Sequence, residues 1–322
     1  MHLNLVDWLV IAAYFAISAA IGFAYTRRAS GSLDEYFVSG RSLPWWLAGT
    51  SMVATTFAAD TPLAVAGFVA KYGVAGNWLW WNGAFSGVLT VFFFSRLWRR
   101  AGVLTDVEFA ELRYGGRPAA ALRGFRALYL ALPINLIIMG WVTRAMVTIL
   151  QVTLDVNPWR AAIILFGVTA LYSVFSGLWG VVVTDAFQFV IAMGGTILLA
   201  VLAVGSVGGL DALTAQVAAH FGSADAAFGV LPPLNQAWLP LSTLLIFLSV
   251  QWWAAWYPGQ EPGGGGYVVQ RILSAKDERH GLLATLWFTI AHYALRPWPW
   301  ILVGFVGLIR YPGLANPEEG YV

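Results

Sequence analysis

The sequence contains no cysteine and few charged residues. The missing cysteines exclude disulfide bonds and thiolate metal sites. Only 11% of the 322 residues are charged, against roughly 25% in an ordinary soluble domain, while 59% are hydrophobic. The mean hydropathy is +0.70. So few charges could not cover a soluble protein of this size, and no alternating pattern is long enough for a β-barrel. The composition therefore predicts an all-α integral membrane protein.

Catalytic and nucleic-acid-binding patterns are also missing. The four histidines have no metal-ligand spacing, and no serine has a histidine and an acid in a matching pattern. The run of four glycines at 263–266 lacks the Gly-Lys-Ser/Thr ending of a phosphate-binding loop. The basic residues occur in loop clusters, which membrane topology explains better than nucleic-acid binding. We therefore expect no enzyme activity, no cofactor and no nucleic-acid partner.

Long apolar runs are what the sequence has in place of charge. A spanning helix needs about 20 apolar residues, and about eight segments satisfy this requirement. The first run is followed, not preceded, by basic residues, which is the opposite of a signal peptide. The predicted spans cover about 5–25, 46–70, 75–95, 126–150, 161–178, 182–205, 238–258 and 281–309.

The distribution of Lys and Arg predicts the orientation of these spans. If the N-terminus lies outside, 13 of the 18 basic residues fall in the cytoplasmic loops 26–45, 96–125 and 259–280 or at their edges. The longest predicted outer loop, about 206–237, has none. We therefore expect a multi-pass protein of the cytoplasmic membrane with both ends outside.

Two of the predicted spans contain helix breakers. The first break is "ATTFAADTP", at 54–62, and the second lies at 256–266, where two prolines precede a run of four glycines. Paired interrupted helices are typical of transporter binding sites, although simple kinks would give the same pattern. Asp60 lies inside the first break, where a carboxylate needs either an ion partner or a wet cavity. Arg144 and Arg296, which also fall within spans, are its candidate partners.

Three stretches of the sequence resemble the sodium:solute symporter family. They are "DEYFVSGRSLPWWLAGTSMVATTFAAD" at 34–60, "YSVFSGLWGVVVTDAFQF" at 172–189 and "YVVQRILSAKD" at 267–277. Their order and spacing extend the resemblance over nearly the whole chain.

The resemblance implies a leucine-transporter-type inverted-repeat fold within a single transmembrane domain, 1–322. Residues 5–25 would be an extra N-terminal helix, 46–205 the first repeat with core helices 1–5, and 238–309 the start of the second repeat with core helices 6 and 7. Family members are usually longer, and core helix 8, which supplies half of the sodium site, would be missing. We therefore expect an incomplete fold and a fragment of a longer transporter.

The resemblance also implies roles for individual residues. The backbone carbonyls of Ala54 and Phe57 would bind sodium, and Asp185 would lie on the sodium exit path. Some sugar-contacting residues of the family are replaced, since threonines stand in the first core helix here, and this argues against galactose. The implied substrate-contacting residues are Thr56, Asp60, Thr61, Trp253 and Trp256.

The implied function is sodium-coupled symport of a small polar solute, such as a sugar, an amino acid or a carboxylate. Sodium would be the coupling ion, and the lipid bilayer the surroundings. Two alternatives remain open at this point. The chain could be a transporter-like sensory module fused to a histidine kinase, or a remnant that does not transport.

Overall fold

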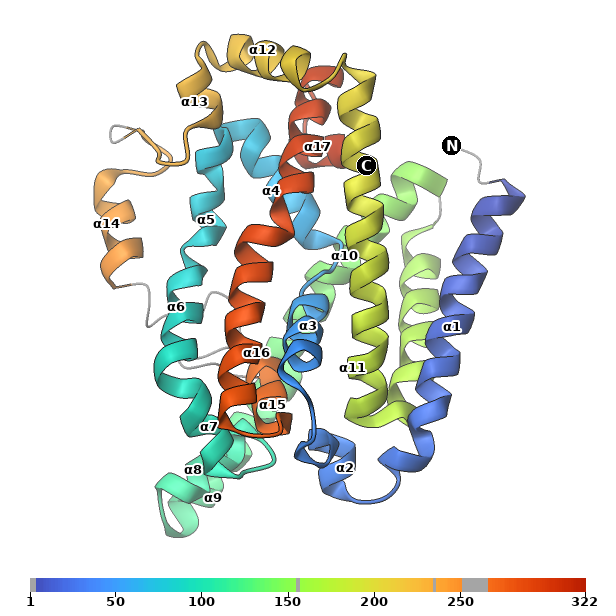
Figure 1. The fold of residues 1–322 in the computed structure, drawn as a ribbon, viewed down its shortest axis with the longest axis vertical. Helices are drawn as coiled ribbons and strands as arrows, with labels where there is room; N and C mark the ends of the chain where they lie inside the picture. The colour runs from blue at the N-terminus through green and yellow to red at the C-terminus, as the bar shows by residue number, and fades with distance from the viewer. Residues whose placement is uncertain (1–3, 155–156, 234–235, 251–265) are drawn as a thin grey trace.

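The structure is a computed structural model that describes residues 4–154, 157–233, 236–250 and 266–322. Every regular element in these ranges is a helix, and the helices form a bundle whose longer members run roughly along one direction (Figure 1). A single β-bridge joins Leu43 to Ala275 within the described ranges. Trp253 and Trp256, predicted to contact substrate, lie outside the described residues, as does most of the second predicted break.

The N-terminal helix α1 (Leu5–Ala29) has the signals expected of an outlying membrane helix. The Asn4 side chain accepts hydrogen bonds from the amides of Val6 and Asp7, and Asp7 bonds back to the Asn4 amide, which completes a capping box. Most of its apolar side chains are exposed, as lipid-facing side chains would be. The helix packs mainly against α11.

The first predicted break is present. Four residues separate helix α3 (Trp45–Thr55) from α4 (Asp60–Tyr72), and the two helices meet at a bend of 66°. Pro62 lies in the first turn of α4, where backbone N–H groups make no hydrogen bond within the helix, so the missing N–H of proline costs nothing there. We call the non-helical residues 56–59 the hinge.

The next helices are interrupted by short π segments. The chain forms η2 (Val74–Asn77), α5 (Trp78–Trp81), α6 (Gly83–Leu89), the π segment η3 (Thr90–Phe94) and α7 (Ser95–Ala101). After η4 (Asp106–Glu108) and α8 (Phe109–Arg113) come α9 (Gly116–Tyr129), the π segment η5 (Leu130–Ile134) and α10 (Asn135–Leu154). Pro133 lies inside η5 and accounts for that interruption.

Helix α11 (Pro158–Ser206) consists of two helical halves joined at Gly177. The backbone of Gly177 has φ of 55°, and the chain reverses direction there (Figure 1). An added Cβ would lie 2.7 Å from Cβ of Ala29, so glycine is favoured by space as well as by φ. The reversal lies at the boundary that we expected between the spans 161–178 and 182–205.

The remaining elements complete the bundle and cover one end of it. Helices α12 (Leu210–Phe221) and α13 (Ala224–Phe228) lie across the upper end in Figure 1. They are followed by α14 (Leu241–Ser249), α15 (Gly266–Ser274), α16 (Glu278–Ile290), the π segment η7 (Ala291–Leu295), α17 (Pro297–Arg310) and η8 (Pro317–Tyr321). Helix α2 (Leu33–Val38) and η1 (Ser39–Arg41) precede α3 at the lower end.

The expected number of spans is not confirmed. Among the described residues, three helices are long and apolar enough to cross a membrane, or up to four if the bent pair α3 and α4 counts as one. Interruptions explain the lower number, because η7 divides the predicted span 281–309 into shorter helices.

The main apolar core surrounds α3. Buried side chains of α3, α11, α15 and α16 pack together there, among them Met52, Val182 and Phe288. The Leu43 bridge also fixes the start of α3, because the Leu43 amide donates to the Ser274 carbonyl at 3.0 Å. The first broken helix is therefore held against the segment that follows the second predicted break.

Candidate functional site

The hinge exposes backbone groups that a continuous helix would use. The Phe57 amide donates to the Ala54 carbonyl at 2.9 Å, and the Thr61 hydroxyl donates to the Thr56 carbonyl at 3.2 Å. The Phe57 carbonyl accepts no hydrogen bond from any described residue. Carbonyl oxygens suit hard cations such as sodium, and a carbonyl has two lone pairs. The Phe57 carbonyl is therefore available to a cation, and the Ala54 carbonyl has one lone pair to offer.

The described part of the chain contains no group of three or more His, Asp or Glu that could hold a metal ion. A cation at the hinge would thus depend on backbone and hydroxyl oxygens rather than on clustered carboxylates.

Asp60 begins α4 and lies directly after the hinge. Its carboxylate accepts a hydrogen bond from the Trp141 indole at 3.1 Å and lies beside the first amides of its own helix. Among the described ion pairs, none joins Asp60 to Arg144 or Arg296. An indole is the direct side-chain donor to Asp60, and Arg296 acts on this carboxylate through its charge without a direct contact.

A cavity of about 620 Å³ opens beside the hinge, between α3, α4, α10 and α11. Its lining includes Thr56 and Thr61, both predicted to face substrate, and Asp60 as its single charged side chain among the described residues. We call it the threonine cavity. Its other polar or aromatic lining residues are Thr55, Trp80, Trp141, Thr143, Phe166 and Thr169. Hydroxyls and indoles around one carboxylate can bind a small polar solute by hydrogen bonds and stacking.

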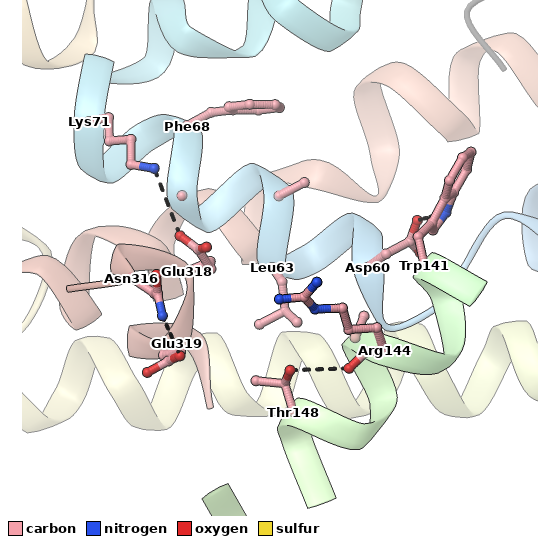
Figure 2. Close-up of a pocket in the computed structure, with 13 residues that line it drawn as sticks. Asp60, Leu63, Phe68, Lys71, Trp141, Arg144, Thr148, Asn316, Glu318 and Glu319 are labelled. Carbon is pink, nitrogen blue, oxygen red and sulfur yellow. Dashed lines mark hydrogen bonds and ion pairs between the residues drawn. The ribbon is translucent and has the colours of Figure 1, made fainter. Parts of the chain in front are cut away.

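A second cavity, of about 420 Å³, is lined by the same carboxylate (Figure 2). We call it the charged cavity, because Asp60, Lys71, Arg144, Glu318 and Glu319 all line it. Asp60 and Trp141 line both cavities. Their hydrogen bond therefore stands at the junction between the two spaces.

Asp185, predicted on the sodium exit path, lies in the second half of α11 and joins a buried polar network. It forms an ion pair with Arg271 of α15 at 3.4 Å, and the Ser51 hydroxyl donates to the same carboxylate oxygen. Arg271 also donates to the hydroxyls of Ser51 at 3.1 Å and Thr55 at 3.3 Å. The network connects α11, α15 and α3 next to the hinge.

Arg296, the other candidate partner of Asp60, is fully buried behind the hinge. Its guanidinium donates to the Val53 carbonyl at 3.2 Å and lies 5.3–5.8 Å from the ring centres of Phe57, Trp80 and Trp300. Neighbouring His292 hydrogen-bonds to the Thr56 hydroxyl at 3.1 Å. Arg296 thus supports the end of α3 through a carbonyl and aromatic faces.

Several of these residues were missed by the sequence analysis. Arg271 was assigned to a cytoplasmic loop, yet it is buried and pairs with Asp185. Ser51, Thr55 and Trp141 were not singled out at all. The signal that could have found Arg271 is its position on α15, because apolar residues surround it on a helix whose one face is strongly apolar.

A broken membrane helix, backbone oxygens at the break and adjoining polar cavities are the features of secondary transporters. The comparisons agree with this class. The model of the sodium:solute symporter family matches residues 36–305, and the chain belongs to this family.

Individual relatives are similar over most of the chain. A sodium/glucose cotransporter of Vibrio parahaemolyticus is 26% identical over 99% of the chain and 61% of its own length. Sodium/glucose cotransporter 4 of Mus musculus is 29% identical over 87% of the chain and 41% of its own length. The chain thus spans less than two thirds of the curated relatives it matches.

A solved structure supports the fold. The substrate-bound, outward-open state of a Na+-coupled sialic acid symporter superposes with a TM-score of 0.78, covering 99% of this chain and 65% of that one. At 18% identity, the likeness concerns the fold alone. The described chain therefore has an all-helical fold similar to that part of the symporter which it covers.

Proposed function

We propose that this protein takes part in sodium-coupled symport of a small polar solute. The observation that carries the proposal is the hinge, where an open Phe57 carbonyl lies next to a cavity lined by Thr56, Asp60 and Thr61. Sodium would bind the carbonyls of Ala54 and Phe57, and the solute would occupy the threonine cavity. Because both sites share one hinge, sodium would favour the hinge geometry that binds the solute.

The Asp185 network gives the same segment a connection to other helices. Ser51 and Thr55 belong to α3, so a shift of α3 on sodium release would disturb the contacts of Asp185 with Arg271. We assign to Asp185 a role along the sodium path, in which its carboxylate attracts the departing ion while Arg271 competes for that carboxylate.

We place the protein in the cytoplasmic membrane with its N-terminus outside. Basic residues such as Arg41, Arg99 and Arg100 gather at the lower end of the bundle in Figure 1, where α2 and α7 lie. The positive-inside rule makes this end cytoplasmic.

The test is uptake by proteoliposomes carrying an inward gradient of sodium or, in parallel, of potassium. The solutes are glucose, amino acids and short carboxylates. A membrane potential of 100 mV alone, with one sodium ion per solute, would support roughly 50-fold accumulation of a neutral solute, and the sodium gradient adds to this. We expect uptake of one solute class with sodium only, unchanged by Val190→Ala on the lipid-facing side of α11. Equal uptake with potassium would contradict the proposal.

A further inference from the structure

The charged cavity contains two groups of opposite charge that do not pair. Arg144 extends from α10 into the cavity, and its guanidinium makes no hydrogen bond or ion pair with any described residue (Figure 2). Asp60 lines the same cavity from α4, and its side-chain donor is the Trp141 indole. Among the described residues, neither group therefore has a direct ion-pair partner in the cavity, although the buried Arg296 acts on Asp60 through its charge.

The other charged residues of the cavity already have partners. Lys71 forms an ion pair with Glu318 at 3.9 Å, and Asn316 donates to Glu319 at 2.9 Å (Figure 2). The contact of Lys71 with Glu318 joins α4 to the segment around η8, and both contacts lie at the end of the cavity away from Trp141. The unpaired groups are thus confined to the end that adjoins the threonine cavity.

The charges of Asp60 and Arg144 restrict the chemistry of a ligand that binds between them. A neutral sugar would leave both charges without a direct ion-pair partner. A simple anion would be repelled by Asp60, and a simple cation by Arg144. A zwitterion satisfies both, because an ammonium group pairs with a carboxylate and a carboxylate accepts the forked donors of a guanidinium.

We propose that the charged cavity binds a zwitterionic solute of the α-amino acid type, with its ammonium group on Asp60 and its carboxylate on Arg144. This inference rests on the proposed function, because it assigns a substrate class to the transporter. Since Asp60 and Trp141 also line the threonine cavity, the solute would keep its contact with Asp60 while it passes from one cavity to the other.

The experiment measures thermal unfolding of the purified chain in sodium chloride with each of the 20 common amino acids and with glucose. The amino acid with the largest stabilisation is then compared with its amide, which lacks the negative charge, and with its deaminated acid, which lacks the positive charge. We expect both analogues to bind roughly 10- to 100-fold more weakly.

Charge-removing variants assign the contacts. Asp60→Asn should lower the affinity for the amino acid but leave the affinity for the deaminated acid unchanged. Arg144→Gln should lower the affinity for the amino acid but leave the affinity for its amide unchanged. Asp211→Asn and Arg160→Gln, at exposed sites away from the cavity, are the matched controls and should change neither affinity.

The outcomes separate this inference from the proposed function. Sodium-dependent binding of glucose that both cavity variants leave unchanged would overturn the zwitterion site and leave sodium symport standing. Failure of every solute to bind in a sodium-dependent manner would overturn both.

Discussion

The ion pair between Asp185 and Arg271 allows a quantitative prediction. The side chains are only 13% and 6% exposed, and the charged atoms lie 3.4 Å apart. Asp185→Asn would leave the Arg271 guanidinium buried beside the hydroxyls of Ser51 and Thr55, which cannot neutralise it. Removing one member of a buried pair costs about 3–5 kcal/mol. Because Asp185 keeps some exposure and the contact is long, we expect a loss of about 3 kcal/mol in the free energy of unfolding.

A double-mutant cycle isolates the pair itself. Replacing both partners, by Asp185→Leu and Arg271→Met, should restore much of the stability, because no unpaired charge then remains buried. We expect a coupling energy of roughly 2 kcal/mol. The assay is unfolding in mixed detergent micelles, followed by tryptophan fluorescence.

The surface pair of Arg100 with Glu278 serves as the matched control. Its atoms are closer, at 2.9 Å, but the side chains are 65% and 40% exposed. Its coupling should be too small to measure, because solvent screens exposed charges. Equal coupling energies for the two pairs, or stability unchanged by Asp185→Asn, would refute the reasoning.

Three further predictions concern packing, backbone conformation and pH. Gly304→Val should lower the free energy of unfolding by about 1–3 kcal/mol, because an added Cβ would lie 2.7 Å from Cγ2 of Val69. Gly194→Ala should leave it unchanged, because a Cβ added there meets nothing within 4 Å. Equal thermal shifts for the two variants would contradict this reasoning. Gly177→Ala should lower the melting temperature, since φ is 55° there, and an unchanged melting temperature would show that the reversal tolerates a side chain. The amide of His280 lowers the pKa of Asp277 by donating to its carboxylate, which caps the start of α16. The cap therefore stabilises the folded protein at pH above the ordinary pKa of about 4, and this stabilisation is lost as the pH falls through the lowered pKa. Asp277→Ala should therefore cost about 1 kcal/mol at pH 7 and progressively less in acid, and a deficit independent of pH would exclude the cap.

The break in the first core helix could be predicted from the sequence because it is local. Pro62 and the polar residues around Asp60 mark it directly, and α3 and α4 separate there. The family was also accessible, because the stretch 34–60 is specific and the family model matches 36–305.

Contacts between distant residues could not be predicted in the same way. The partner of Asp60 is Trp141, about one quarter of the chain away, and charge alone pointed to Arg144 or Arg296 instead. Two arginines were available to one acid, and only the packing of α10 against α4 decides which side chain reaches it. Arg296 illustrates the same limit, since a carbonyl and three aromatic faces surround it where an acid was expected.

The hinge also gives the most direct test of sodium binding, because amide hydrogen exchange reads this segment without knowledge of the solute. Exchange of residues 54–61 is measured in sodium chloride and in potassium chloride at equal ionic strength, with the loop 102–105 as an internal control. If the carbonyls of Ala54 and Phe57 hold sodium, residues 54–61 should exchange more slowly in sodium while the control loop stays unchanged. Identical exchange of residues 54–61 in the two salts would contradict a sodium site at the hinge.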